Sequence, residues 1–206
     1  PPAIINLTDT CGTFAFDYQS IYSPSGLNPD YTGVMGLNNF DDSWGIWGHN
    51  LRKVLGDNVD KVYATIHGKT DDSQLCFSSE EMYRQIESYI VDNIGEKGSS
   101  RFVIAPDDTP YACTCASCTA MGNTEKNATP AVTELLLRLS QRFPKHSFFT
   151  ISYLSTKQVT DKQLPSNAGI IVSAIDFPLR RIDGKNAQEK KFMQQLNQWK
   201  KVTKDI

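Results

Sequence analysis

Four cysteines are spaced so that their sulfur atoms could share one metal ion. Cys113, Cys115 and Cys118 lie in the stretch CTCASC, and Cys76 directly precedes a predicted helix. A structural zinc site needs four tetrahedral ligands, and Cys76 is the best candidate for the fourth. Only Cys115 and Cys118 have the CxxC spacing of usual zinc modules. Three states are therefore open: structural zinc, a disulfide between Cys76 and one of the other three, and packed free thiols.

Other cysteine chemistry is less compatible with the sequence. The chain has five cysteines, so at least one of them cannot sit in an intramolecular disulfide. No histidine accompanies the CTCASC stretch, which argues against a nucleophilic cysteine. The three histidines form no HxH or HxxxH pair, so nothing indicates a catalytic metal. We expect no required cofactor other than the structural zinc that the cysteines admit.

Aspartates follow two of the predicted strands. Asp107 and Asp108 come directly after the apolar run RFVIA, and Asp176 ends the run GIIVSAI. Hydrolysis of a glycosidic bond uses two carboxyl groups. Adjacent residues of an extended segment point to opposite faces, so Asp107 and Asp108 aim at the same bond only if the backbone turns there. These three aspartates are the catalytic candidates, with Asp176 as the second carboxylate.

Aromatic and hydrogen-bonding residues suggest a place for a sugar. The stretch WGIWGHN contains Trp44, Trp47, His49 and Asn50, and Tyr153 ends another strand-like run. Trp and Tyr rings cover flat apolar surfaces such as the faces of sugar rings, while His and Asn can hydrogen-bond to hydroxyls. These five residues are the substrate-binding candidates. Packing of both tryptophans in the core, with His49 as a helix cap, is an equal alternative.

The elements that would position these residues alternate between strand and helix. Helical patterns begin at Ser78, where Glu81 completes a capping box, at Thr129 as N-cap before Pro130, and at Asn186. Such alternation predicts an α/β fold with parallel strands, in which functional residues gather where the strands end. The strand-like runs are 14–18, 62–66, 102–105, 148–154 and 169–175, and the helical runs are 78–94, 129–143 and 186–202.

Composition limits the partners that the chain could have. Its 206 residues are 39% hydrophobic and 21% charged, with a net charge of -2, so we expect one α/β domain spanning 1–206. The basic residues are scattered, which argues against a nucleic-acid partner. No apolar run is long enough for a transmembrane segment. The chain opens PPAIINLTDTC, without an initiator Met or a signal-like core, so we expect that a leader was removed.

Several stretches together resemble a known family. LNNFDDSWGIWGHNLRKVL, SQLCFSSEEMY, IAPDD with CTCASC, NATPAVTELLLRLSQRFP and GIIVSAIDFP occur in this order between about Phe14 and Trp199. The chain resembles a bacterial domain of unknown function from polysaccharide-utilisation loci. That family is similar to glycoside-hydrolase barrels of the α-glucuronidase and β-hexosaminidase type. The CxCxxC after an Asp-rich strand end is the most specific shared element.

The resemblance implies a partial (β/α)8 TIM-like barrel, and a chain that is a fragment of a larger glycoside-hydrolase-like protein. Composition alone, with about five strands, favours an open doubly wound α/β sheet. Asp108 stands at the family's aspartate, and we expect it to be the acid or a substrate-positioning group. Asp107 replaces the family's usual Asn, and Asp17-Tyr18-Gln19 replaces Glu-Tyr-Arg. The loss of that Arg weakens recognition of a uronate.

The function implied by the resemblance is a glycoside-hydrolase-like, carbohydrate-active domain that acts on a polysaccharide or glycan. The alternative is a non-catalytic glycan-binding or scaffold domain. Either would place the protein in a secreted, periplasmic or cell-surface setting of a bacterium. A partial barrel also leaves open sheet edges, which predicts self-association.

Overall fold

The computed structural model describes residues 18–21, 23–39, 44–175, 177 and 184–206. Its contacts divide the chain into two units, Pro1–Asp42 and Ser43–Ile206. A single domain over residues 1–206 stays a prediction. The predicted strand 14–18 lies outside the described residues except for Tyr18, and Asp176 also lies outside them.

The described part of the smaller unit is built around a short helix. This helix, α1 (Pro29–Met35), follows the 3-10 turn η1 (Pro24–Leu27). The side chain of Asn28 accepts hydrogen bonds from the first backbone N–H groups of α1, and Gly36 ends the helix in the left-handed conformation with φ 64°. Gln19 and Asn38 hydrogen-bond to each other and close the segment around α1.

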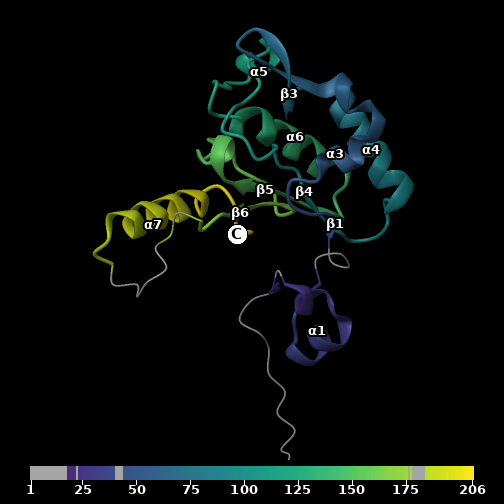
Figure 1. The fold of residues 1–206 in the computed structure, drawn as a ribbon, viewed down its shortest axis with the longest axis vertical. Coiled ribbons are helices and arrows are strands. Elements are labelled where there is room, and N and C mark those ends of the chain that lie inside the picture. The colour runs from purple at the N-terminus through teal and green to yellow at the C-terminus, as the bar shows by residue number, and fades with distance from the viewer. Residues whose placement is uncertain (1–17, 22, 40–43, 176, 178–183) are drawn as a thin grey trace, which may run out of the picture. The chain divides into compact units, whose positions relative to one another are not determined.

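The larger unit contains a parallel sheet of four strands (Figure 1). They are β1 (Trp44–Ile46), β4 (Arg101–Val103), β5 (Ser147–Ser152) and β6 (Ala168–Val172), in the order β1-β4-β5-β6. Each strand lies beside the one that precedes it in the parallel set. The α/β fold with parallel strands is therefore confirmed. The predicted strands 102–105, 148–154 and 169–175 overlap β4, β5 and β6, whereas β1 was not predicted.

The predicted strand at 62–66 is a strand, but it does not belong to the parallel sheet. It forms β2 (Tyr63–Ile66), which pairs antiparallel with β3 (Lys69–Leu75). His67 and Gly68 connect the two strands with φ values of 50° and 75°. Two central residues with positive φ are typical of a type I′ hairpin turn. The expectation that 62–66 is one of the parallel strands was therefore wrong.

The helices begin close to the predicted positions, with two corrections at their caps. Ser79, not Ser78, caps α4 (Glu80–Asn93) by accepting from the N–H of Met82. Thr129 is the first residue of α6 (Thr129–Arg142), and its hydroxyl donates to Gln158 O instead of capping the helix. Asn186 caps α7 as predicted. The remaining elements are α3 (Leu51–Leu55), η2 (Gly56–Val62), α5 (Ala116–Ala120), η3 (Leu154–Thr156) and α7 (Ala187–Trp199).

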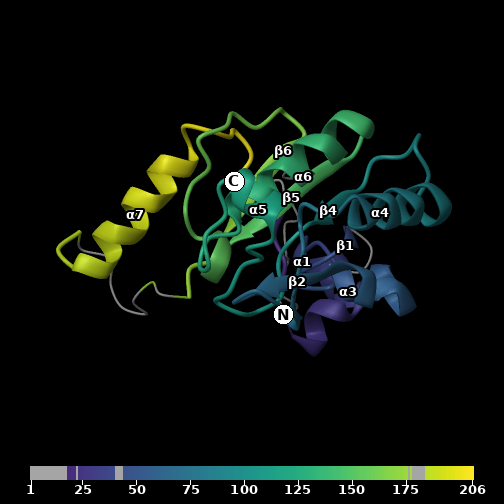
Figure 2. The same ribbon diagram turned by 90° about the horizontal axis from the view of Figure 1, so that it is seen from above.

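Side chains of three helices contact the same face of the sheet, and the figures show that α7 extends away to one side of it (Figures 1 and 2). Side chains of α4 and α6 form one core cluster with Phe102 and Phe148. Trp199 of α7 donates from Nε1 to Ser152 Oγ, and Ser152 shares a face with Phe148 because alternate strand residues point the same way. Phe149 points to the opposite face. None of the three helices α4, α6 and α7 lies on the face of the sheet to which Phe149 points.

The chain returns to the sheet after α7. The backbone N–H of Ile170 in β6 donates to Asp205 O, and Thr203 donates from its hydroxyl to Ala168 O. Residues 203–205 therefore lie along the edge of β6 that β5 leaves open. Among the described helices, none has the length and apolar character that crossing a membrane requires.

Candidate functional site

Residues that follow three of the parallel strands meet at the carboxyl ends of these strands. His49 follows β1, Pro106 follows β4 and Tyr153 follows β5. The Nδ1 atom of His49 lies 2.5 Å from Pro106 O, and because a carbonyl only accepts, Nδ1 carries the proton. The ring centroids of His49 and Tyr153 are 6.2 Å apart. The imidazole is exposed and the phenol is partly exposed.

The two predicted tryptophans pack against each other. The ring centroids of Trp44 and Trp47 are 4.8 Å apart, and Trp44 also contacts the buried Phe149 edge-on at 5.4 Å. Both tryptophans remain partly exposed. The amide of Asn50 donates to Trp47 O at 2.5 Å and does not cap α3. Asn50 therefore holds the chain at Trp47 and has one oxygen left to accept a hydrogen bond.

Asp107 is held by an arginine that the sequence did not reveal. One oxygen of its carboxylate, Oδ2, accepts from both Arg52 Nη2 at 2.6 Å and Arg52 Nε at 2.8 Å. The hydrogen bond to Asp107 raises the pKa of Arg52. The buried Gln74 accepts from the N–H of Asp107 and donates to Asp107 O. Asp107 therefore fastens the loop after β4 to α3 and β3.

The other two predicted carboxylates are placed differently. Asp108 is exposed and makes no ion pair or side-chain hydrogen bond with the described part of the chain. Asp176 lies outside the described residues. Of the three catalytic candidates, the structure thus describes one aspartate that is bound to arginine and one that is free at the surface.

A hollow of about 260 Å³ lies between α7 and the segments that follow β5 and β6. It contains none of the predicted site residues. Its lining is mainly polar and basic, with one phenylalanine: Lys157, Ser173, Gln188, Lys191, Phe192 and Gln195.

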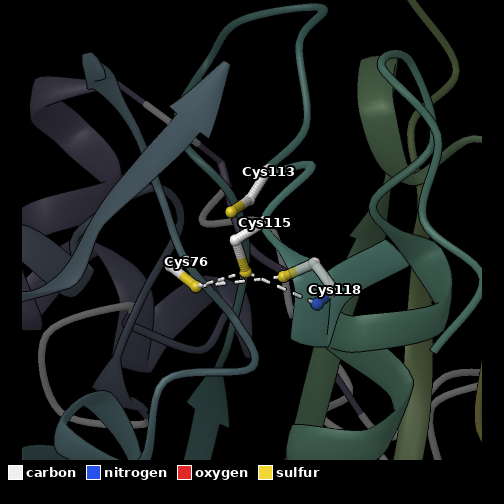
Figure 3. A group of neighbouring side chains, drawn as sticks. All are labelled: Cys76, Cys113, Cys115 and Cys118. Carbon is white, nitrogen blue, oxygen red and sulfur yellow. Dashed lines mark hydrogen bonds between the residues drawn. The ribbon is translucent and has the colours of Figure 1, made fainter. Parts of the chain in front are cut away.

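The four predicted cysteines gather into one cluster (Figure 3). Their four Sγ atoms lie within 4.8 Å of one another. Cys76 Sγ is 3.7 Å from Cys115 Sγ and 3.9 Å from Cys118 Sγ. Cys76 comes directly after β3, Cys113 and Cys115 lie in the loop after β4, and Cys118 lies in α5. None of the four forms a disulfide.

Backbone donors point at the sulfur atoms. Thr65 N–H donates to Cys113 Sγ at 3.2 Å, and Cys118 N–H donates to Cys115 Sγ at 3.5 Å. Hydrogen bonds from Cys118 and Cys76 lower the pKa of Cys113, and the same cluster raises the pKa of Cys76. Cys113 is therefore the thiol of the cluster that ionises more readily, and Cys76 is harder to ionise beside it.

The sequence did not indicate the residues that contact Asp107, nor the serine beside the four cysteines. Arg52 and Gln74 reach Asp107 from positions 55 and 33 residues earlier in the chain, so no local pattern marked them. Ser78 lies 3.0 Å from Cys118 Sγ, and its place two residues after Cys76 was a signal that could have been used.

Comparison with family models matches residues 50–206 to a family described as Domain of unknown function (DUF4838). The matched segment contains the four cysteines, Asp107, Asp108 and Tyr153, and it begins at Asn50. Searches of curated proteins and of solved structures gave no match.

Proposed function

The chain belongs to the family described as Domain of unknown function (DUF4838), and we propose that it is a carbohydrate-binding domain. The glycan would lie across the carboxyl ends of β1, β4 and β5. One observation carries this proposal: two rings from different strand ends, the exposed His49 and the partly exposed Tyr153, meet beside Pro106 from a third. Ligands of α/β sheets bind at this end of the strands.

We further propose that the sheet is an arc of a (β/α)8 barrel. In a doubly wound sheet the strand order reverses and helices cover both faces. Here the order follows the chain, and α4, α6 and α7 pack on one face. The residues after α7 lie against β6, where the next strand of a barrel would pair.

The chemistry of the strand ends suits a sugar. Because His49 Nδ1 donates to a backbone carbonyl, its Nε2 is left for a hydrogen bond with a sugar hydroxyl. The rings of Trp47 and Tyr153 each offer an apolar face with a polar edge. A pyranose ring likewise has an apolar face and polar hydroxyl groups around it. A glycan partner fits the secreted, periplasmic or cell-surface setting that the family resemblance implies.

Binding is better supported than hydrolysis. Cleavage of a glycosidic bond uses two carboxyl groups on either side of that bond. Among residues 47–50, 104–109, 153–156 and 173–175, which directly follow the four parallel strands, Asp108 is the one carboxylate without an ion pair, because Arg52 holds Asp107. A second carboxylate would have to come from residues outside those segments.

Calorimetric titration of the chain with a panel of oligosaccharides tests the proposal. The panel should include neutral, uronic acid and N-acetylhexosamine sugars. We expect Trp47→Ala and Tyr153→Ala each to weaken binding about tenfold, since an aromatic contact contributes on the order of 1 kcal/mol. The matched control is Tyr111→Ala, which removes an exposed ring that faces His67 and should leave affinity unchanged. Absence of binding across the panel would refute the proposal, as would equal effects of all three substitutions.

A further inference from the structure

We propose that Cys76, Cys113, Cys115 and Cys118 together bind one tetrahedral structural Zn²⁺. This inference does not depend on the proposed glycan site. The structure contains four sulfur atoms that come from segments far apart in the sequence and converge on one point (Figure 3). Thiolates in a tetrahedral set of four are typical of zinc.

The spacing of the sulfur atoms fits a metal better than disulfides. A Zn–S bond of about 2.3 Å sets tetrahedral sulfurs about 3.8 Å apart. The separations of Cys76 Sγ from Cys115 Sγ and Cys118 Sγ, 3.7 Å and 3.9 Å, are close to this value, and no pair exceeds 4.8 Å. A disulfide would need Cys76 and Cys115 to approach to about 2.0 Å, roughly 1.7 Å closer, and it would leave two thiols beside it.

The surroundings of the cluster favour thiolates. Two of the sulfurs accept backbone N–H hydrogen bonds, from Thr65 and from Cys118. Such bonds stabilise the negative charge of a ligand and fix its orientation. Cys113 and Cys118 are buried, so several thiolates could not coexist there without a cation. A divalent ion removes this repulsion and makes full deprotonation favourable.

The role of the ion would be structural. Four protein ligands leave no open coordination position for water or substrate, which is the arrangement of structural zinc. The ion would connect the end of β3 to the loop after β4 and to α5. The same loop carries Asp107 and Asp108, so the metal would hold these aspartates in place beside the strand ends.

The first test uses the unmodified chain and measures metal and thiols together. We expect elemental analysis to give about one zinc per chain, and stepwise modification of thiols with a mercurial to release it. Replacement by Co²⁺ should give the intense visible bands of tetrahedral thiolate coordination. Chelation should lower the melting temperature by on the order of 10 °C.

Variants with a matched control make the assignment specific. Cys76→Ser is expected to lose the zinc after dialysis against a chelator, whereas Cys11→Ser, which removes the fifth cysteine, should retain it. If Cys76→Ser does not fold, the measurements on the unmodified chain still decide. The proposal is overturned by a metal-free chain whose mass shows disulfides among the four cysteines. It is also overturned by bound iron in place of zinc, or by zinc that persists in Cys76→Ser.

Discussion

The ion pair between Arg52 and Asp107 should stabilise the fold and take no part in chemistry. Asp107→Asn keeps the shape of the side chain and removes its charge. Hydrogen bonds between charged groups contribute about 1.5–3 kcal/mol, but Arg52 is 34% exposed against 16% for Asp107, so solvent screens part of the interaction. We therefore expect Asp107→Asn to lower the free energy of unfolding by about 1–2 kcal/mol.

Urea unfolding with a double-mutant cycle measures this contribution directly. The cycle combines Asp107→Asn with Arg52→Gln, and the coupling energy should be about 1 kcal/mol. Asp108→Asn is the matched control, because this neighbouring carboxylate is exposed and should change stability by less than about 0.5 kcal/mol. The reasoning fails if the coupling energy is near zero, or if Asp108→Asn costs as much stability as Asp107→Asn.

Three further predictions concern the sheet. Gly45→Ala should destabilise the fold by about 1–3 kcal/mol in urea unfolding, because an added Cβ would lie 2.4 Å from the buried ring of Phe102; an unchanged midpoint would contradict this. His146→Ala should cost about 2–3 kcal/mol, since the buried imidazole bonds two backbone groups that would lose their partner; a loss below 0.5 kcal/mol would refute that role. Truncation after Val202 should increase self-association in light scattering by uncovering the edge of β6, and an unchanged monomer would contradict it.

The longer elements could be predicted from sequence because their signals are local. The apolar stripes of α4 and α6 extend over enough residues to show a helical period, and β5 and β6 are continuous apolar runs of strand length. β1 has three residues, Trp44–Ile46, too few for any period, and its two-tryptophan surroundings suggested only a binding surface. β3 contains Asp71 and Asp72, which are unfavourable in strands, so pairing with β2 had to supply its stability.

The four cysteines could be chosen from the sequence, but the surroundings of Asp107 and Asp108 could not be predicted from it. Cys76 was selected as the fourth sulfur because it directly precedes a predicted helix, and the structure brings it to the other three. Nothing local could show that Asp107 is held by Arg52 while Asp108 is exposed. The choice between those neighbours depends on a side chain from another part of the chain, 55 residues away.

The order of the strands affects how the larger unit can fold during synthesis. β4, β5 and β6 each pair with the parallel strand that leaves the ribosome before them. Domains fold from the N-terminus as they are synthesised, at about 5–20 residues per second. Each strand of this sheet after β1 therefore meets a partner that has already been synthesised. One edge of the nascent sheet is always its newest strand, and at this edge a chaperone would have to act until the next strand is synthesised.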